Sequence, residues 1–234
     1  MRYSPILATA LLALAACSQA PAPSQEAAPA AKAAPAPLTI AAPSGTYKVD
    51  RNHADLSFRL KHLGLADYVA RFHDYSMVVE LDSENLGASS VRLEIDPTSV
   101  RTGYAGDYKA THKDSAYETW EEDLAQSERF FNAGQFPKIV FQSSSVSQMD
   151  DHLMVSGDLT MLGKTLPVTM AVYIVGAKAE HPMTRKGAFG VSARGSFQCS
   201  PFGMDFLVKQ GLLGDTVTVA FDGEFHQVDA PPAE

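Results

Sequence analysis

The sequence predicts an all-β domain built from about eight antiparallel strands. Apolar residues recur at every second position in eight separate stretches after Gly45. Turn signals such as Leu162-Gly163-Lys164 separate several of these stretches. The alternation of helices and strands that is typical of parallel sheets does not occur. The pattern therefore leaves an antiparallel sandwich and an up-and-down barrel as the two alternatives.

The overall composition excludes two classes of protein. The 234 residues carry a formal net charge of −8, which argues against nucleic acid as a partner, because phosphates call for clustered Lys and Arg. Two cysteines cannot build a disulfide scaffold. All 16 glycines lie between Gly45 and Gly223, whereas six of the 14 prolines lie between Pro21 and Pro43. The chain thus divides into a Pro-rich N-terminal segment and a β domain.

The first 16 residues have the pattern of an export signal. Arg2 precedes an apolar run that ends at Ala16 and is shorter than the roughly 20 residues of a membrane-spanning helix. The stretch from Leu14 to Cys17 resembles the bacterial lipobox, whose cysteine is lipidated; a plain secretory signal with a chance cysteine is the alternative. We predict a signal peptide over 1–16, a lipid anchor at Cys17, and a periplasmic protein. By resemblance to bacterial lipoproteins, Ser18 favours the outer membrane.

The next segment, residues 17–43, is expected to be a tether. Of the 24 residues from Ala20 to Pro43, 17 are Ala or Pro, a composition that favours extended polyproline II over a helix. Such a stretch acts as a semi-rigid spacer between membrane and domain. The β domain is expected over 44–228, followed by a short tail over 229–234.

The β domain contains the eight alternating stretches and one interruption. The stretches cover residues 56–62, 73–81, 91–95, 139–141, 153–161, 168–174, 189–199 and 217–225. Between Gly103 and Gln135 charged and aromatic residues mix without a two-residue period. We expect a short helix from Asp123 to Phe131 there, with Leu124 and Phe131 facing the barrel mouth.

The interior of the domain can be interpreted in two ways. A barrel of about eight strands either fills with its own side chains or holds one slim ligand. Gly157, Ala193, Gly195 and Gly223 fall at inward positions, where small residues leave room. The same glycines are equally consistent with bends or bulges.

Six short motifs occur in order over residues 47–227. They are Tyr47-Lys48-Val49-Asp50 with His53 and Phe58, Lys61-His62-Leu63-Gly64, Tyr68 to Phe72, Phe130-Phe131 with Phe136 to Phe141, Gly157 to Thr165, and Phe202-Gly203-Met204. Together these motifs resemble the YceI-like family of bacterial envelope proteins. The resemblance implies an antiparallel, eight-stranded, lipocalin-like barrel with a short helical insertion. It also implies an apolar tunnel for a polyisoprenoid lipid. Residues 104–122 and Gln198 to Pro201 depart from the family pattern, which affects the expected head-group preference.

The expected ligand-binding residues are the inward-facing side chains of this barrel. A tunnel lined by Leu, Phe, Met and Val would bury an isoprenoid chain at about 0.8 kcal/mol per methylene group. Methionine suits an irregular chain because it is flexible, although ordinary core packing is an equal alternative. The expected residues are Leu56, Phe58, Leu60, His62, Tyr75, Met77, Val79, Phe131, Phe141, Leu159, Met161, Met170, Val172, Phe189 and Phe197.

The seven histidines form no recognisable metal or catalytic motif, so we expect no metal site and no catalytic residues. The alternation places His62 on the apolar face, where it is either a hydrogen-bonded structural residue or a donor to a quinone carbonyl. Cys199 falls at an inward position and most simply packs as a small apolar residue. An enzyme that uses His62 or Cys199 is a minor alternative.

The sequence therefore favours a membrane-tethered carrier or reservoir for an isoprenoid lipid, with no cofactor other than a bound isoprenoid quinone or polyprenyl lipid. The acidic balance favours an uncharged quinone head. A phosphate head would need the cations Arg59, Lys61, Arg71, Lys138, Arg185 and Lys186 at the mouth. A filled barrel that serves as an envelope interaction or stress protein is the main alternative, and a homodimer stays open.

Overall fold

The computed structural model describes residues 38–228 of the chain. The predicted signal peptide, Cys17 and the tail at 229–234 lie outside the described residues, as does the tether before residue 38. No helix among residues 38–228 has the length and apolar character needed to cross a membrane.

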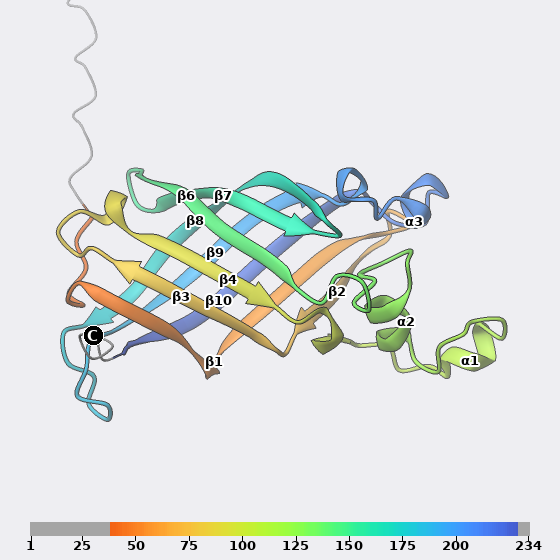
Figure 1. The fold of residues 1–234 in the computed structure, drawn as a ribbon, viewed down its shortest axis with the longest axis horizontal. Helices are drawn as coiled ribbons and strands as arrows, with labels where there is room; N and C mark the ends of the chain where they lie inside the picture. Colours follow the sequence, from red (N-terminus) through yellow and green to blue (C-terminus); the bar gives the residue numbers. More distant parts are fainter. Residues whose placement is uncertain (1–37, 229–234) are drawn as a thin grey trace, which may run out of the picture. The chain divides into compact units, whose positions relative to one another are not determined.

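The described residues form ten antiparallel strands in one sheet, with three short α-helices at one end (Figure 1). The strands are β1 (Gly45–His62), β2 (Ala66–Phe72), β3 (Tyr75–Leu81), β4 (Ser90–Ile95), β5 (Val100–Thr102), β6 (Ile139–Gln148), β7 (Leu153–Met161), β8 (Lys164–Lys178), β9 (Ala188–Gln198) and β10 (Thr216–Gln227). The helices are α1 (Tyr108–Thr111), α2 (Trp120–Gln126) and α3 (Phe206–Lys209), and the 3-10 turns are η1 (Leu86–Ala88), η2 (Pro97–Ser99) and η3 (Ser200–Phe202).

The ten strands reduce to eight strand positions around a closed barrel. β1 pairs with β2 through its C-terminal half (Phe58↔Ala70) and with β3 through its N-terminal half (Tyr47↔Val79). β2 and β3 therefore share one position, and β4 and β5 share the next by pairing with β3 and β2. The prediction of eight strands around the barrel is confirmed. The short strands β2 and β5, which each share a position with another strand, were not predicted.

The barrel closes through the pairing of its first and last strands. Leu56 of β1 lies opposite Phe221 of β10. Each of the remaining strand positions pairs with the positions that come before and after it in the chain. This order is an up-and-down barrel, so the sandwich alternative is wrong. The register of β1 against β10 shifts between Val49 and Ala54, so residues 50–53 bulge out of the ladder opposite Glu224.

The insertion between β5 and β6 carries the helix α2, which starts earlier than expected. The side chain of Thr119 caps the helix by accepting a hydrogen bond from the Glu122 backbone N–H at 3.1 Å. The helix ends at Gln126, because the backbone of Ser127 is extended, so the expected helix from Asp123 to Phe131 is wrong in both bounds. Phe131 is nevertheless held against α2, because its backbone N–H donates to the Leu124 carbonyl at 3.0 Å.

The inward glycines permit close approach of neighbouring strands. A Cβ at Gly157 would collide with the backbone oxygen of Gln142, beside the register shift between Ser143 and Ser145. A Cβ at Gly223 would lie 2.8 Å from Ala54 Cβ, beside the bulge of β1. The interpretation of these two glycines as bulge positions is therefore the correct one.

Candidate functional site

A cavity of about 290 Å³ lies inside the barrel. Side chains of every strand except β5 line it, and α2 and α3 contribute residues at one end. The lining is aliphatic and aromatic apart from three serines, Cys199, Arg129 and the polar edges of Tyr68 and Trp120. Such a cavity suits an apolar ligand with few polar groups.

Thirteen of the fifteen expected ligand-binding residues line this cavity. They are Leu56, Phe58, Leu60, Met77, Val79, Phe131, Phe141, Leu159, Met161, Met170, Val172, Phe189 and Phe197. They lie together because alternate residues of each strand point to the same side of the sheet.

His62 does not lie where the alternation placed it. It is exposed at the end of β1, bridges to Leu213 and is absent from the cavity lining. Leu60 is the last residue of β1 that lines the cavity, because the strand then continues past the barrel rim. The expectation of a buried imidazole on the apolar face is therefore wrong.

Tyr75 is buried as expected but lies beside the cavity and does not line it. Its ring packs edge-on against Phe221 at 6.5 Å between centroids, and the Arg51 guanidinium lies 4.9 Å from the ring centre. Burial raises the pKa of the Tyr75 hydroxyl, which is enclosed without a hydrogen-bond partner. Tyr75 therefore belongs to the wall of the barrel.

One end of the cavity is closed by aromatic packing. Phe189 stacks on Phe225 with ring centroids 5.0 Å apart, and Tyr47 lies 4.9 Å from Phe189. The Tyr47 hydroxyl donates to the Pro43 carbonyl at 2.6 Å, which ties the segment before β1 to this end. We call it the closed end; it lies opposite the helices in Figure 1.

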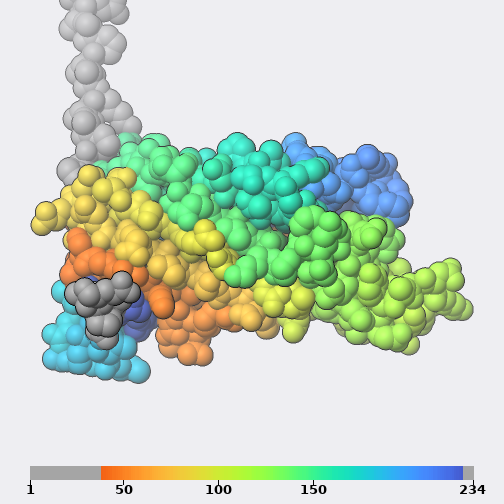
Figure 2. All heavy atoms as spheres, viewed as in Figure 1, coloured from red at the N-terminus to blue at the C-terminus, as the bar shows by residue number. Residues whose placement is uncertain are grey.

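The other end, which carries the helices, contains the mouth of the cavity. Among the described lining residues, only Arg129 and Phe206 are exposed. Arg129 follows α2, whereas Phe206 begins α3, and the guanidinium carbon lies 5.1 Å from the centre of the Phe206 ring. The insertion and the α3 segment therefore meet at this end of the barrel, where Figure 2 shows their green and blue atoms side by side.

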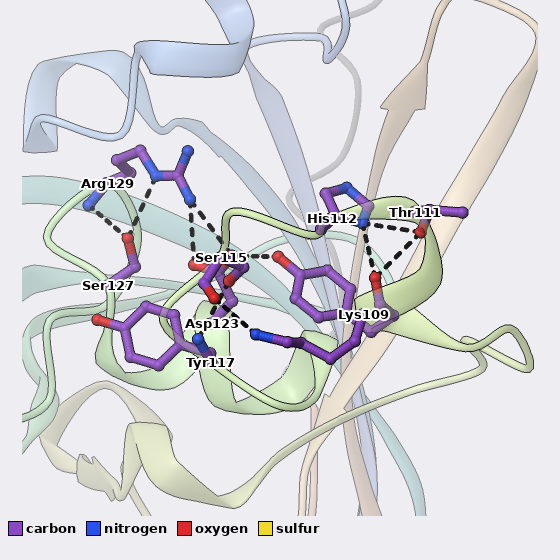
Figure 3. A network of polar contacts seen from close by, with 9 residues as sticks. Lys109, Thr111, His112, Ser115, Tyr117, Asp123, Ser127 and Arg129 are labelled. Atoms are coloured by element: carbon purple, nitrogen blue, oxygen red, sulfur yellow. Dashed lines mark hydrogen bonds and ion pairs between the residues drawn. The ribbon is translucent and has the colours of Figure 1, made fainter.

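Arg129 is held by a buried network. Its Nη2 lies 3.3 Å from a carboxylate oxygen of Asp123, and its Nε donates to the Ser127 hydroxyl at 3.3 Å (Figure 3). Asp123 is fully buried and also accepts a hydrogen bond from the Tyr108 hydroxyl. Burial and the Asp123 carboxylate together raise the pKa of Tyr108. Arg129, the one charged side chain among the described lining residues, is thus neutralised by the buried carboxylate of Asp123.

A second polar pair lies near the mouth. Trp120 Nε1 donates to the Tyr68 hydroxyl at 2.6 Å, and both rings line the cavity. Burial raises the pKa of Tyr68. The Trp120 ring also packs against Phe130 at 5.3 Å, which fixes the insertion over the barrel.

The expected basic residues lie on the outer surface and do not line the cavity. Lys61 pairs with Asp67 at 2.9 Å, Arg71 with Asp55 at 3.1 Å, and Lys138 with Glu94 at 2.6 Å. Arg185 pairs with Glu180 on the loop after β8. The charge at the mouth comes from Arg129, which sequence reasoning missed although it directly precedes the Phe130-Phe131 motif.

Cys199 lines the cavity as a neutral thiol. Burial, aided by the carboxylate of Asp215 at 3.4 Å from Sγ, raises its pKa to about 12. A nucleophilic cysteine needs a lowered pKa, so this thiol lacks the activation that an enzyme would require.

Exposed apolar side chains border the mouth. Leu63 and Leu65 on the β1–β2 turn are 48% and 85% exposed, and Phe206 and Leu212 are 39% and 38% exposed. The turn is joined to the α3 segment because Leu63 N–H donates to the Leu212 carbonyl at 2.9 Å. We call these four residues the apolar lip.

Comparisons with known proteins agree with this geometry. A profile of the YceI-like domain matches residues 47–225. "Protein YceI" of Escherichia coli O157:H7 is 32% identical over 175 residues, which cover 74% of this chain and 81% of that protein. "Protein YceI" of Salmonella arizonae is 32% identical over 167 residues, covering 70% and 78%.

Solved structures share the fold. BcnA of Burkholderia cenocepacia superposes with a TM-score of 0.61 at 20% identity, covering 75% of this chain and 98% of that one. A polyisoprenoid binding domain from Saccharophagus degradans, implicated in plant cell wall breakdown, gives 0.52 at 14% identity, covering 81% and 99%.

Proposed function

This chain belongs to the YceI-like family, and on that premise we propose that its barrel binds one isoprenoid lipid, with an isoprenoid quinone as the preferred ligand. The prenyl tail lies along the cavity toward the closed end, and the quinone head lies at the mouth beside Arg129. In this role the protein is a binding protein and not an enzyme.

The observation that carries the proposal is the apolar cavity along the barrel, which reaches the surface at one end. Each buried methylene group of a prenyl tail contributes about 0.8 kcal/mol, so a long tail supplies affinity without directional contacts. The likeness to a polyisoprenoid binding domain supports the same class of ligand. The cavity favours the lipid-binding proposal over a filled barrel, the alternative interpretation.

The charge balance at the mouth supports an uncharged head group. The Asp123 carboxylate already neutralises Arg129, and Lys61, Arg71, Lys138 and Arg185 are paired with carboxylates outside the cavity lining. A phosphate would have to compete with the buried carboxylate for the guanidinium. A quinone carbonyl would accept one hydrogen bond from Arg129 Nη1, which the contacts to Asp123 and Ser127 leave unused.

The apolar lip supports transfer of the lipid between a membrane and the cavity. A patch of exposed Leu and Phe side chains beside the mouth favours contact with acyl chains. As part of the proposal, lipidated Cys17 and the Ala/Pro-rich tether hold the barrel near the outer membrane on the periplasmic side.

The single tryptophan of the sequence, Trp120, gives a direct test because it lines the cavity. Titration with a soluble short-chain isoprenoid quinone should quench its fluorescence with saturable binding of one quinone per chain. Ala193 lines the cavity, so Ala193→Phe should fill it and abolish saturable quenching. Ala171 lies on β8 but does not line the cavity, so Ala171→Phe is the matched control. Equal quenching in both variants would refute binding inside the barrel.

A further inference from the structure

Three residues with metal-ligand side chains gather near the closed end, outside the lipid cavity. They are His181 on the loop that joins β8 and β9, and Glu224 and His226 near the end of β10. One ligand atom of each residue lies within 4.8 Å of the others. In Figure 1 this loop lies beside the end of β10, on the side away from the helices.

The fold explains why these side chains meet on the outer surface. Phe225 is buried in the core, so the residues on either side of it, Glu224 and His226, face outward. The adjacent strand β1 is bulged over residues 50–53, and this bulge brings Asp50 beside His226. The His181 and His226 rings then meet edge to face, with centroids 4.7 Å apart.

The strongest sign of a ligand is the Nε2 atom of His226. It is buried and has no hydrogen-bond partner, although carboxylate oxygens of Glu224 and Asp50 lie 3.8 Å and 3.9 Å away. These separations exceed a hydrogen bond, which ends near about 3.2 Å. A buried imidazole nitrogen between two carboxylates, bonded to neither, fits a cation shared among them.

The spacing suits a small transition-metal ion. Bonds of about 2.0–2.1 Å in a tetrahedral zinc site place neighbouring ligand atoms roughly 3.3 Å apart. The two carboxylate separations from His226 Nε2, 3.8 Å and 3.9 Å, therefore need contraction of about 0.5 Å, and a pair at the 4.8 Å limit of the cluster needs about 1.5 Å. Glu224 is exposed and His181 lies on a loop, so both side chains can make this adjustment.

We propose that His181, Glu224 and His226 form a binding site for a divalent transition-metal ion of the zinc class, with Asp50 as the fourth ligand. Two imidazoles and one carboxylate are a donor set that zinc accepts. Asp50 is oriented by His53, whose Nδ1 lies 2.8 Å from the Asp50 carboxylate. The ion joins the β8–β9 loop to β10 and to the bulge of β1.

The test is zinc binding by the full chain, purified without an affinity tag and carrying Cys17→Ser in every sample to remove that thiol. Zn²⁺ is titrated in competition with a chromogenic chelator. The chain should bind one ion, and His181→Gln and His226→Gln should each weaken binding at least 100-fold. His152→Gln should bind like the parent, because His152 pairs with Asp151 and stacks on Tyr173 outside the cluster.

A second measurement separates metal loss from unfolding. In the presence of a chelator, the parent and His181→Gln should have similar melting temperatures, because His181 lies on the β8–β9 loop. Addition of Zn²⁺ should raise the melting temperature of the parent but not of His181→Gln, because an ion that binds the folded state stabilises it. The proposal is overturned if the parent binds no zinc or if both glutamine variants bind it with unchanged affinity.

Discussion

The guanidinium carbon of Arg129 lies 5.1 Å from the ring centre of Phe206, and this contact spans the mouth of the barrel cavity. Arg129 belongs to the insertion between β5 and β6, whereas Phe206 begins α3 before β10. Two segments that are far apart in the sequence thus form the entrance together. A ligand that enters between these two segments has to separate the Phe206 ring from the charge-balanced guanidinium of Arg129.

Arg129→Gln should weaken quinone binding about tenfold and leave the binding of squalene, a prenyl hydrocarbon without a head group, unchanged. A hydrogen bond to a charged donor contributes about 1.5 kcal/mol or more, and 1.4 kcal/mol corresponds to a factor of ten. Calorimetric titration of the variant with both ligands checks this. Arg59→Gln, at an exposed position of β1 outside the lining, should bind both like the parent. If the affinities for quinone and for squalene fall equally, Arg129 shapes the mouth and does not recognise the head group.

Asp123→Asn should destabilise the fold by about 1–3 kcal/mol, because the fully buried carboxylate accepts from Tyr108 and pairs with Arg129. Urea unfolding measures the change. The matched control is Asp114→Asn in the same insertion, where the side chain is exposed and the change should stay within about 0.5 kcal/mol. If the two variants are equally stable, the network around Asp123 does not hold the insertion.

The raised pKa of Cys199, about 12, predicts both its reactivity and an alkaline weakness. At pH 8 iodoacetamide should alkylate Cys199 in urea but not in the folded chain. Above the ordinary thiol pKa of 9.0 the unfolded chain loses a proton that the folded chain keeps, so stability should fall as pH rises from 9 to 12. In Cys199→Ala this fall should be smaller. Rapid alkylation of the native thiol at pH 8 would contradict the buried environment.

Leu65→Glu should slow quinone transfer from vesicles into the barrel without changing stability or equilibrium affinity. Leu65 is 85% exposed on the apolar lip, so its removal costs little in folding but adds charge where acyl chains would touch. Transfer is followed by quenching of Trp120. Val175, 73% exposed on β8 and outside the lip, gives the matched variant Val175→Glu, which should transfer like the parent. Similar slowing in both variants would mean that the added negative charge slows transfer wherever it is placed, which would contradict a role of the apolar lip.

His62→Ala should leave quinone affinity unchanged, because His62 is exposed beyond the rim and does not line the cavity. The Trp120 titration measures it beside the parent. A substantial loss of affinity would mean that the head group lies outside the mouth as we define it, over the end of β1.

The period-two pattern was sufficient to predict most of the barrel interior. Residues such as Met77, Phe141 and Val172 sit in regular strands, where alternation alone decides which side chains face inward. The same rule failed for His62 because alternation does not say where a strand leaves the barrel. The division of one strand position between β2 and β3 depends on the break at His73 and Asp74, where the buried side changes from Phe72 to Tyr75, a step of three residues that the predicted stretch starting at His73 did not take into account.

The mouth and the histidine cluster depend on tertiary contacts that no local spacing encodes. Arg129 meets Phe206 across more than 70 positions of the chain, and Asp123 is buried although Glu121 and Glu122, which directly precede it, are not. His181 and His226 are brought together by the ladder of β9 and β10, so a search for metal motifs along the sequence finds nothing.

The central claim is that the barrel holds an isoprenoid lipid, and the most direct measurement is mass spectrometry of organic extracts from the full chain made in a bacterial envelope. The parent should yield a prenyl lipid, with quinone prominent, at close to one molecule per chain, and Ala193→Phe should yield little. Recovery of no prenyl lipid from the parent, together with no saturable quenching of Trp120 by added quinone, would contradict the claim.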